Sequence, residues 1–333
     1  MKTPLSELLG IQHPILLASM DLVADAKLTV AVSDAGGFGI LGGGYGDADW
    51  LAQQLPSLIA AKTSRKLPFG IGFITWSLAK QPQLLDQALA AQPDAVWLSF
   101  GDPAPFIDKI KKTGCLLICQ VQSVAMAQDV VMKGADIVVA QGAEAGGHGV
   151  SCSTMTLVPA VVDAIGHKTP VVAAGGIGDG RGFAAALMLG AQGVALGTRF
   201  YACQEAAAHP EAKARIVAAS GEDTVRSIVF DISRRNVWPA PYTGRCLKNE
   251  HIRKWLGKEL ELMRHMPEEG ERYLAARNNG DFGTAAVIAG EIVGLIHDVP
   301  TAGEIVQRVI LDAEALLGSG RHADFDGPRL AVD

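Results

Sequence analysis

The sequence lacks several features that mark particular classes of protein. It has 29 Lys and Arg against 35 Asp and Glu, a net charge of −6, and so no basic excess for binding nucleic acid. No apolar run approaches the roughly 18 residues that a membrane helix needs. The start, MKTPLSELLGIQHP, contains Glu7 and no apolar stretch typical of a signal peptide. We therefore expect a soluble, cytoplasmic protein with no nucleic-acid or membrane partner.

Cysteines are few and scattered, which argues against a disulfide framework. The five cysteines lie at positions 115, 119, 152, 203 and 246, an odd and uneven set that suits a reducing compartment. No spacing of His, Cys, Asp and Glu indicates a metal site, and no Ser, His and Asp order indicates a hydrolase. We expect no bound metal.

One glycine motif does not fit its usual function. Residues 37–42 read Gly-Phe-Gly-Ile-Leu-Gly, formally a GxGxxG motif. A dinucleotide fingerprint leaves a strand and opens a helix, whereas this stretch follows a helix-like segment and enters a strand-like run. The motif therefore does not support a Rossmann domain.

Eight short, β-rich apolar runs occupy the first two-thirds of the chain. They are ILLA (15–18), FGIL (38–41), FGIGF (69–73), AVWLSF (95–100), LLICQV (116–121), DIVVAQG (136–142), PVVAAGG (170–176) and GVALGT (193–198). Continuous apolarity indicates strands buried on both faces of a parallel sheet, and helix-like segments follow each run. Eight such units in about 200 residues predict an α/β fold, a (β/α)8 TIM barrel. A doubly wound sheet is the alternative.

The recurring strand-like runs end before Ala202, and none follows it. From about residue 210 to 290 the chain is charged and helix-like, without strand runs, as in HIRKWLGKELELMRHM. We predict three parts: a barrel at 1–210, a helical subdomain at 211–290 that caps the barrel mouth, and C-terminal helices at 291–333 that pack back on the barrel.

The strand ends should hold the site, because the chemistry of such barrels lies at the carboxyl ends of the strands. AAGGIGDGRG follows the seventh run and GTR follows the eighth. Glycines there let backbone N–H groups approach an anion, and a helix N-terminus adds a favourable dipole. We predict a phosphate at Gly175, Gly176, Gly197 and Thr198, the alternative being a plain strand–helix turn.

The loop after the sixth run combines one glutamate and one histidine with several glycines. AQGAEAGGHG places Glu144 and His148 beside Gly146 and Gly147, whose missing side chains let a ligand approach. An imidazole can take a proton near neutral pH or orient an anion, so His148 is the candidate catalytic residue. Glu144 could bond a ligand hydroxyl, pair with a base or satisfy backbone donors of the turn.

Together these stretches resemble the nitronate monooxygenase family, formerly called 2-nitropropane dioxygenases. Relatives of that family include FMN-dependent enoyl-ACP reductases and flavin NADH:quinone reductases. The similarity covers essentially the whole chain and is carried by QHPILLASM, DAGGFGILGGG, AQGAEAGGHG, STMTLVP, AAGGIGDGRGFAAALMLGAQGVALGTRF and DFGTAAVIAGEIVGLIHDVPTA. The set is specific for the superfamily and less so for one activity, because the reductases share several of its motifs.

The resemblance implies non-covalent FMN in the barrel mouth, with its phosphate at the glycines after the seventh and eighth runs. His148 would remove the α-proton of a nitroalkane or hold the anionic nitronate. The flavin would then take an electron, and O2 would complete the conversion to a carbonyl compound and nitrite. The residues expected to bind FMN are Ala18, Ser19, Met20, Gly72, Gln120, Glu144, Gly146, Gly147, Gly175, Gly176, Gly197 and Thr198.

Two departures from the family pattern concern the pocket. Gly72 stands where the family often has Asn, and Leu-Ala-Ser-Met at 17–20 replaces Gln-Ala/Gly-Pro/Gly-Met. Gln120 favours the monooxygenase, since a quinone reductase relative carries Lys at that point and an enoyl reductase relative an apolar residue.

The alternatives are an FMN-dependent NAD(P)H reductase of quinones or enoyl thioesters, and a barrel that binds a phosphorylated molecule without redox turnover. The expected partners are a small nitronate or nitroalkane and O2, with a homodimer as a candidate assembly.

Overall fold

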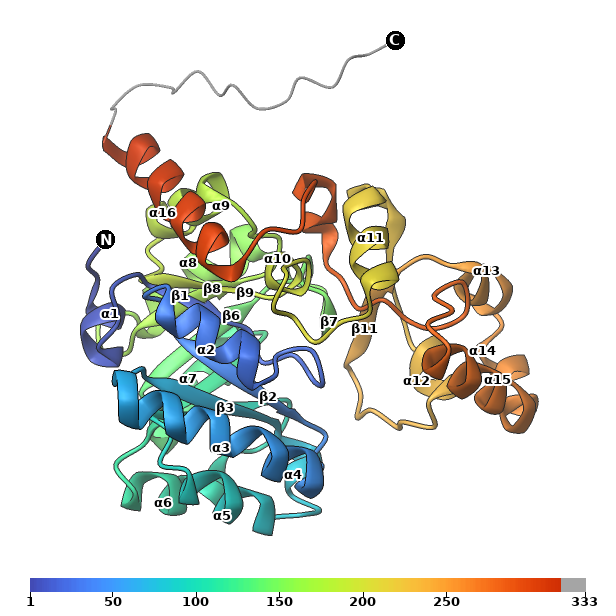
Figure 1. The fold of residues 1–333 in the computed structure, drawn as a ribbon, viewed down its shortest axis with the longest axis horizontal. Helices are drawn as coiled ribbons and strands as arrows, with labels where there is room; N and C mark the ends of the chain where they lie inside the picture. Colours follow the sequence, from blue (N-terminus) through green and yellow to red (C-terminus); the bar gives the residue numbers. More distant parts are fainter. Residues whose placement is uncertain (319–333) are drawn as a thin grey trace.

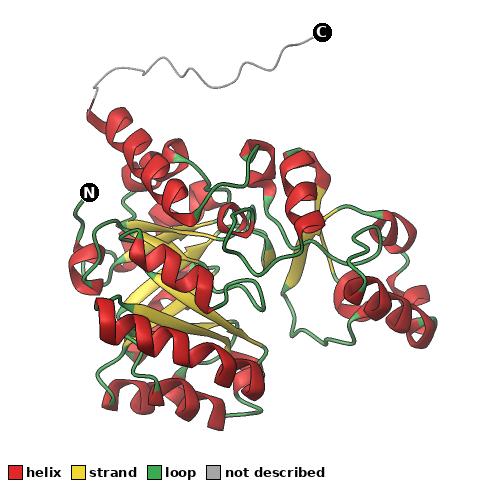
Figure 2. Cartoon of the chain, viewed as in Figure 1, coloured by secondary structure: helices red, strands yellow, loops and turns green. Residues whose placement is uncertain are grey.

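The computed structural model describes residues 1–318, and its larger part is a closed parallel barrel (Figures 1 and 2). The barrel strands are β1 (Ile15–Leu17), β2 (Gly39–Gly44), β3 (Phe69–Ile74), β4 (Ala95–Ser99), β5 (Leu116–Val121), β6 (Ile137–Gln141), β8 (Val171–Ala174) and β9 (Gly193–Leu196). They pair in the order β1-β9-β8-β6-β5-β4-β3-β2, and a parallel bridge between Leu16 and Phe38 joins the two ends. The predicted (β/α)8 TIM barrel is confirmed.

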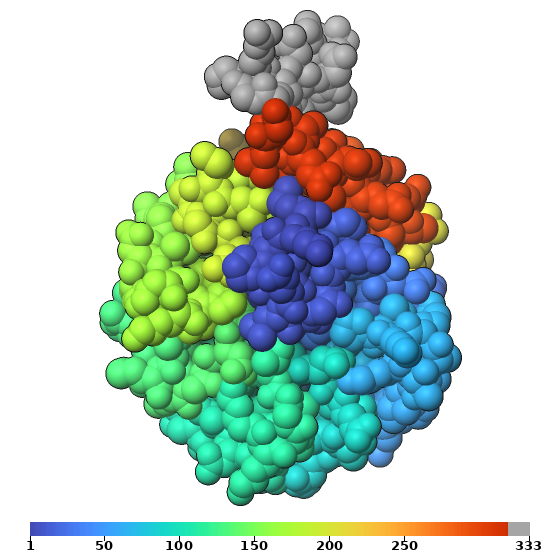
Figure 3. Space-filling model, turned by 90° about the vertical axis from the view of Figure 1, so that its left-hand side faces the viewer, coloured from blue at the N-terminus to red at the C-terminus, as the bar shows by residue number. Residues whose placement is uncertain are grey.

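The amino end of the barrel is sealed by the first helix. In α1 (Pro4–Leu9), the Thr3 side chain accepts a hydrogen bond from the Ser6 N–H and caps the helix. Leu5 and Leu9 of this helix pack with the side chains that fill the barrel. Figure 3 shows the N-terminal residues at the centre of that face, ringed by the barrel helices. A ligand can therefore reach the strands only from their carboxyl ends.

Helices surround the strands in chain order. They are α2 (Ala26–Asp34), α3 (Ala48–Arg65), α4 (Thr75–Leu78), α5 (Gln83–Ala90), α6 (Ala104–Lys112), α7 (Val124–Lys133), α8 (Thr154–Ile165), α9 (Gly180–Met188) and α16 (Ala302–Gly318). The last of these packs against α9 and α2, which is the place of the eighth barrel helix (Figure 1). The segment between β9 and α16 is thus an insertion into the last strand–helix unit.

This insertion lies over the carboxyl side of the barrel, to the right in Figure 1. Its elements are α10 (Thr198–Tyr201), α11 (Pro210–Ala218), η1 (Gly221–Asp223), β10 (Thr224–Ser227), α12 (Val229–Ser233), β11 (Thr243–Leu247), α13 (Glu250–Trp255), α14 (Glu259–Arg264), α15 (Met266–Asn278) and η2 (Glu291–Leu295). Buried side chains from Tyr201 to Ile296 form a hydrophobic cluster distinct from those of the barrel.

The expectation that residues 210 to 290 contain no strands is wrong. Strands β10 and β11 form an antiparallel sheet that β7 (Gly147–Gly149) completes in the order β10-β11-β7. The sequence TVRS–TGRCL hid them because arginines occupy inward-facing positions that a sequence pattern assigns to solvent. The domain bounds 1–210, 211–290 and 291–333 remain a prediction, and residues 319–333 of the last range lie outside the described part.

Candidate active site

A cavity of about 370 Å³ lies between the carboxyl ends of the barrel strands and the insertion. Ligand sites in proteins commonly measure roughly 300–1,000 Å³. Twelve of the thirteen residues singled out from the sequence line it, namely Ala18, Ser19, Met20, Gln120, Glu144, Gly146, Gly147, His148, Gly175, Gly176, Gly197 and Thr198. Gly72 is the exception. The fold therefore brings together residues from five strand ends that are far apart in the sequence.

One wall of the cavity offers backbone N–H groups that the protein does not use. Gly175 and Gly176 have φ values of 111° and 69°, which turn the chain from β8 toward the N-terminus of α9 and favour glycine. In the described part of the chain, neither their N–H groups nor that of Gly197 donates to a protein acceptor. Thr198 Oγ1 accepts the Gly290 N–H at 2.9 Å, which leaves its hydroxyl hydrogen to donate. This wall can bind a phosphate through several donors.

Across the cavity, His148 is held in β7 and is 7% exposed. Its Nε2 lies 3.0 Å from Asp231 Oδ2, and Trp238 stacks on the imidazole with 3.4 Å between ring centroids and 8° between planes. Burial lowers the pKa of His148 below its ordinary value, and the Asp231 carboxylate offsets part of that decrease. At neutral pH the imidazole is therefore neutral and able to accept a proton.

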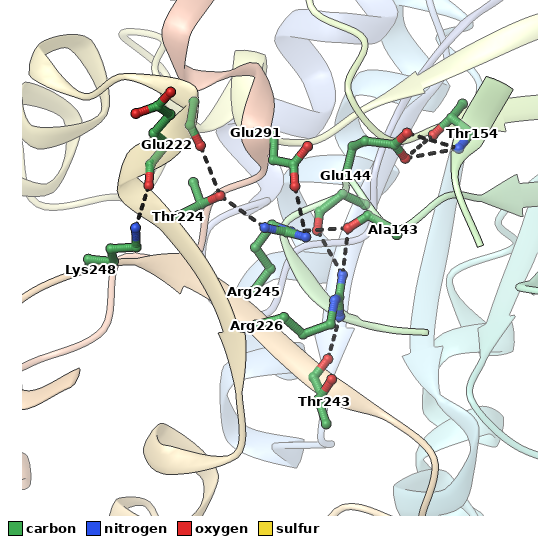
Figure 4. A network of polar contacts seen from close by, with 12 residues as sticks. Ala143, Glu144, Thr154, Glu222, Thr224, Arg226, Thr243, Arg245, Lys248 and Glu291 are labelled. Atoms are coloured by element: carbon green, nitrogen blue, oxygen red, sulfur yellow. Dashed lines mark hydrogen bonds and ion pairs between the residues drawn. The ribbon is translucent and has the colours of Figure 1, made fainter. Parts of the chain in front are cut away.

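The loop that carries His148 is fixed by two arginines of the small sheet (Figure 4). Arg226 donates to the carbonyls of Ala143 at 2.9 Å and of Ala145 and Gly147 at 3.3 Å. Arg245, its cross-strand partner, donates to the Ala143 carbonyl at 3.0 Å. Burial lowers the pKa of Arg226 to about 10. The arginines thus satisfy carbonyls of a glycine-rich loop that has little secondary structure of its own.

Both carboxylate oxygens of Glu144 already accept hydrogen bonds from within the protein. Its two oxygens accept from the Thr154 N–H at 3.1 and 2.9 Å, and Oε2 also accepts the Thr154 hydroxyl at 2.7 Å. Figure 4 shows this pair at the start of α8. Of the roles considered for Glu144, the structure displays the one in which the carboxylate satisfies backbone donors, at a helix N-terminus that favours a negative charge.

A chain of amide side chains connects Gln120 to the loop that carries His148. Gln141 Oε1 accepts from Gln120 Nε2 at 2.8 Å and from Gln122 Nε2 at 2.9 Å. Gln141 Nε2 in turn donates to the His148 carbonyl at 3.1 Å. Gln120 therefore lines the cavity while also bracing the backbone of His148 from the barrel side.

The two departures from the family pattern are connected in space. A Cβ at Gly72 would lie 2.3 Å from Ser19 Oγ and 2.5 Å from Ser19 Cβ, far closer than atoms can pack. The Ser19 side chain thus occupies the space that any side chain at position 72 needs. Gly72 shapes the cavity wall through Ser19 and does not line the cavity itself.

Sequence reasoning missed several residues at this site, of which Asp231, Arg234 and Trp238 are the most informative. Arg234 and Trp238 line the cavity, and Arg234 Nη2 lies 2.9 Å from Asp231 Oδ1. All three belong to the insertion, where no motif or strand end marked them. Asp21 was also missed; burial raises the pKa of its carboxyl, and Arg277 and Arg234 counteract that rise.

Comparison with known proteins identifies the family of the chain. The model of the family described as nitronate monooxygenase matches residues 2–89 and 76–312. The chain belongs to the nitronate monooxygenase family. It is therefore an enzyme of a family of oxidoreductases. A nitronate monooxygenase of Metarhizium robertsii is 36% identical over 92% of this chain and 92% of its own length.

Two further proteins that are similar to this chain carry other names. A Rhodococcus jostii protein is 30% identical over 94% of this chain and 96% of its own length. Its name is (3aS,4S,5R,7aS)-5-hydroxy-7a-methyl-1-oxo-octahydro-1H-indene-4-carboxyl-CoA dehydrogenase. The structure of FabK from Thermotoga maritima superposes with a TM-score of 0.83 at 32% identity, covering 96% of this chain and 99% of that one.

Within residues 1–318, no group of three or more His, Cys, Asp or Glu side chains is arranged to hold a metal ion. No helix in the same range is both long and apolar enough to cross a membrane.

Proposed function

We propose that this member of the family is an FMN-dependent nitronate monooxygenase that converts alkyl nitronates or nitroalkanes and O2 to a carbonyl compound and nitrite. The observation that carries the proposal is the pairing, across one cavity, of a neutral, buried His148 with unused amides at Gly175, Gly176 and Gly197. A base and an anion cradle are the two elements that the reaction asks of the protein.

The residues present fit FMN. The amides after β8 and β9 would hold its phosphate, with Thr198 adding a hydroxyl, and Ala18, Ser19 and Met20 line the same cavity on the β1 side. When bound, FMN supplies the one-electron chemistry between the nitronate and O2. Nothing but glycine fits at Gly175, where a Cβ would lie 2.7 Å from Thr154 Oγ1.

His148 would accept the α-proton of a neutral nitroalkane and then, as an imidazolium, hold the nitronate that forms. The buried setting assists both steps, because it keeps the free imidazole neutral and strengthens its attraction for the product anion. A preformed nitronate needs no base and should bypass the first step.

Replacing His148 tests this role directly. We expect His148→Asn to retain FMN and to lower kcat/KM for nitroethane by about 10²- to 10⁴-fold, the usual contribution of a general base, with a much smaller effect on ethyl nitronate. His167→Asn, at an exposed histidine in the turn after α8, is the matched control. Undiminished nitroethane turnover by the variant would exclude His148 as the base.

An anaerobic visible spectrum separates the monooxygenase from a reductase. Loss of the flavin band, or a semiquinone signal, with nitronate but not with NADH supports the proposal. Rapid bleaching by NADH alone would instead favour an NAD(P)H-dependent reductase.

A reductase of thioesters is the second candidate, because the Rhodococcus relative is named for a carboxyl-CoA substrate. The cavity has a suitable feature in Arg277, which lines it and is exposed, and whose guanidinium makes no hydrogen bond or ion pair with residues 1–318. A purified protein that binds no flavin, even with FMN added, would leave only a phosphate-binding barrel.

A further inference from the structure

The strongest unassigned feature of the molecule is the set of contacts around His148. Nε2 is 3.0 Å from Asp231 Oδ2, and both side chains are 7% exposed. An ionised carboxylate can only accept hydrogen bonds, so Nε2 carries the imidazole hydrogen. The other nitrogen, Nδ1, has no partner among the described residues and is not one of the fully enclosed unpartnered atoms. Since His148 lines the cavity, its Nδ1 lone pair is the atom open to a ligand.

Arg234 gives the second oxygen of that carboxylate a separate partner. Its Nη2 lies 2.9 Å from Asp231 Oδ1, and its Nε donates to the Phe230 carbonyl at 3.2 Å. The guanidinium can only donate, so the atom that faces it at position 231 must be an oxygen acceptor. The two oxygens of Asp231 are thus divided between a permanent cation and the imidazole.

Trp238 prevents the ring from exchanging its two nitrogens. The indole stacks on the imidazole at 3.4 Å between centroids, and its own Nε1 donates to Tyr45 Oη at 2.9 Å. Gly244 pairs with His148 on the facing strand β11. The stacked indole hinders the rotation of the imidazole that would exchange Nδ1 and Nε2.

We propose that Asp231 is the positioning residue of His148, fixing the tautomer so that Nδ1, and not Nε2, takes the substrate proton. The proposal rests on the proposed function only for the identity of the reaction. The charged groups that act on the imidazole are Asp231 of α12, the following Arg234, and Arg226 of β10. In the step itself, Nδ1 gains the α-proton of the nitroalkane, the C–H electron pair remains as the nitronate, and Nε2–H stays bonded to Asp231.

Asp231→Asn makes a sharp test because Arg234 dictates how the amide must sit. The guanidinium requires the amide oxygen, so the amide NH2 turns toward His148 and donates to Nε2. The neutral imidazole must then carry its hydrogen on Nδ1, the wrong tautomer for accepting a proton from the cavity. An Asp-to-Asn change at a comparable His partner lowers turnover by about 10⁴-fold through this effect in serine proteases.

The direct readout is the 15N spectrum of the FMN-loaded full chain labelled at its eight histidines, with His148→Asn used for assignment. The wild type should show a protonated Nε2 and a bare Nδ1, and Asp231→Asn the reverse. A wild-type His148 that carries its hydrogen on Nδ1 would overturn the proposal without any variant having to fold. This readout needs no turnover, so it stands even if neither nitroethane nor its nitronate is a substrate, an outcome that would instead refute the proposed function.

Kinetics give the second readout. Asp231→Asn should lower kcat/KM for nitroethane at least a hundredfold while changing that for ethyl nitronate by no more than several-fold. Asp231→Asn combined with Arg234→Met frees the amide to turn, so it should restore the wild-type tautomer and part of the nitroethane activity. Asp281→Asn, whose side-chain oxygen can still accept from the Gly283 N–H, is the control. Equal losses on both substrates would indicate a merely structural role and contradict the proposal.

Discussion

At the scale of single residues, Ser19 and Gly72 form a coupled pair. Because a Cβ at position 72 would lie 2.3 Å from Ser19 Oγ, Gly72→Ala should lower the free energy of unfolding by about 1–3 kcal/mol, the usual cost of overpacking. Ser19→Gly alone should be milder, and the double variant should recover most of the loss. Urea unfolding of the four proteins measures the coupling. A double variant as unstable as Gly72→Ala would show that the clash lies elsewhere.

The sequence indicates a position at the cavity where a residue closely follows a buried strand. Gly175, Gly176 and Gly197 follow β8 and β9, and His148 lies among glycines after β6, and all four line the cavity. Asp231 and Trp238 gave no such indication, since they reach His148 from the insertion, and Asp231 lies 83 positions after His148 in the chain. No spacing in the sequence records such a contact.

At the scale of elements, the small sheet holds the His148 loop through Arg226. Arg226→Lys keeps a positive charge but loses the fork that serves several carbonyls at once. We expect it to reduce stability by about 1.5–3 kcal/mol, the worth of a hydrogen bond from a charged group, and to lower nitroethane turnover by misplacing His148. Thermal unfolding and initial rates measure the two effects. Arg65→Lys, at an exposed arginine at the end of α3 that pairs with Asp34, is the control, and a similar loss there would refute the argument.

The small antiparallel sheet β10-β11-β7 also explains why the secondary structure of the insertion was incompletely predicted. The barrel strands are apolar throughout, so their sequence alone indicates burial on both faces. Strands β10 and β11 instead place Arg226 and Arg245 opposite each other, and these side chains are partly buried against loop carbonyls. The two arginine side chains are buried by the loop between β6 and α8, which is distant in the sequence. The strands therefore cannot be recognised from their own residues and become apparent only in the tertiary structure.

At the scale of the whole molecule, the sequence and the structure agree on the barrel and differ on how the site is completed. The strands deliver the proposed anion-binding glycines and the His148 loop to one end. The insertion between β9 and α16 then adds the groups that orient the imidazole. The barrel supplies the binding surface and the insertion tunes its chemistry, so acid-induced loss of function should begin in the insertion.

His251 in α13 makes that expectation measurable. It is 3% exposed, its Nε2 lies 2.7 Å from Ser233 Oγ, and burial lowers its pKa to about 4 against the pull of Glu269. The unfolded chain binds a proton at about pH 6.5, so the folded state binds fewer protons between these values. The contribution of His251 to the free energy of unfolding is complete above about pH 6.5 and is lost as the pH falls toward about 4, a decrease of about 2–3 kcal/mol.

His251→Gln, which can still donate to Ser233, should flatten this decline when urea unfolding is measured across pH. His265→Gln, at an exposed histidine of the same insertion, should not, and parallel profiles for the wild type and His251→Gln would refute the assignment.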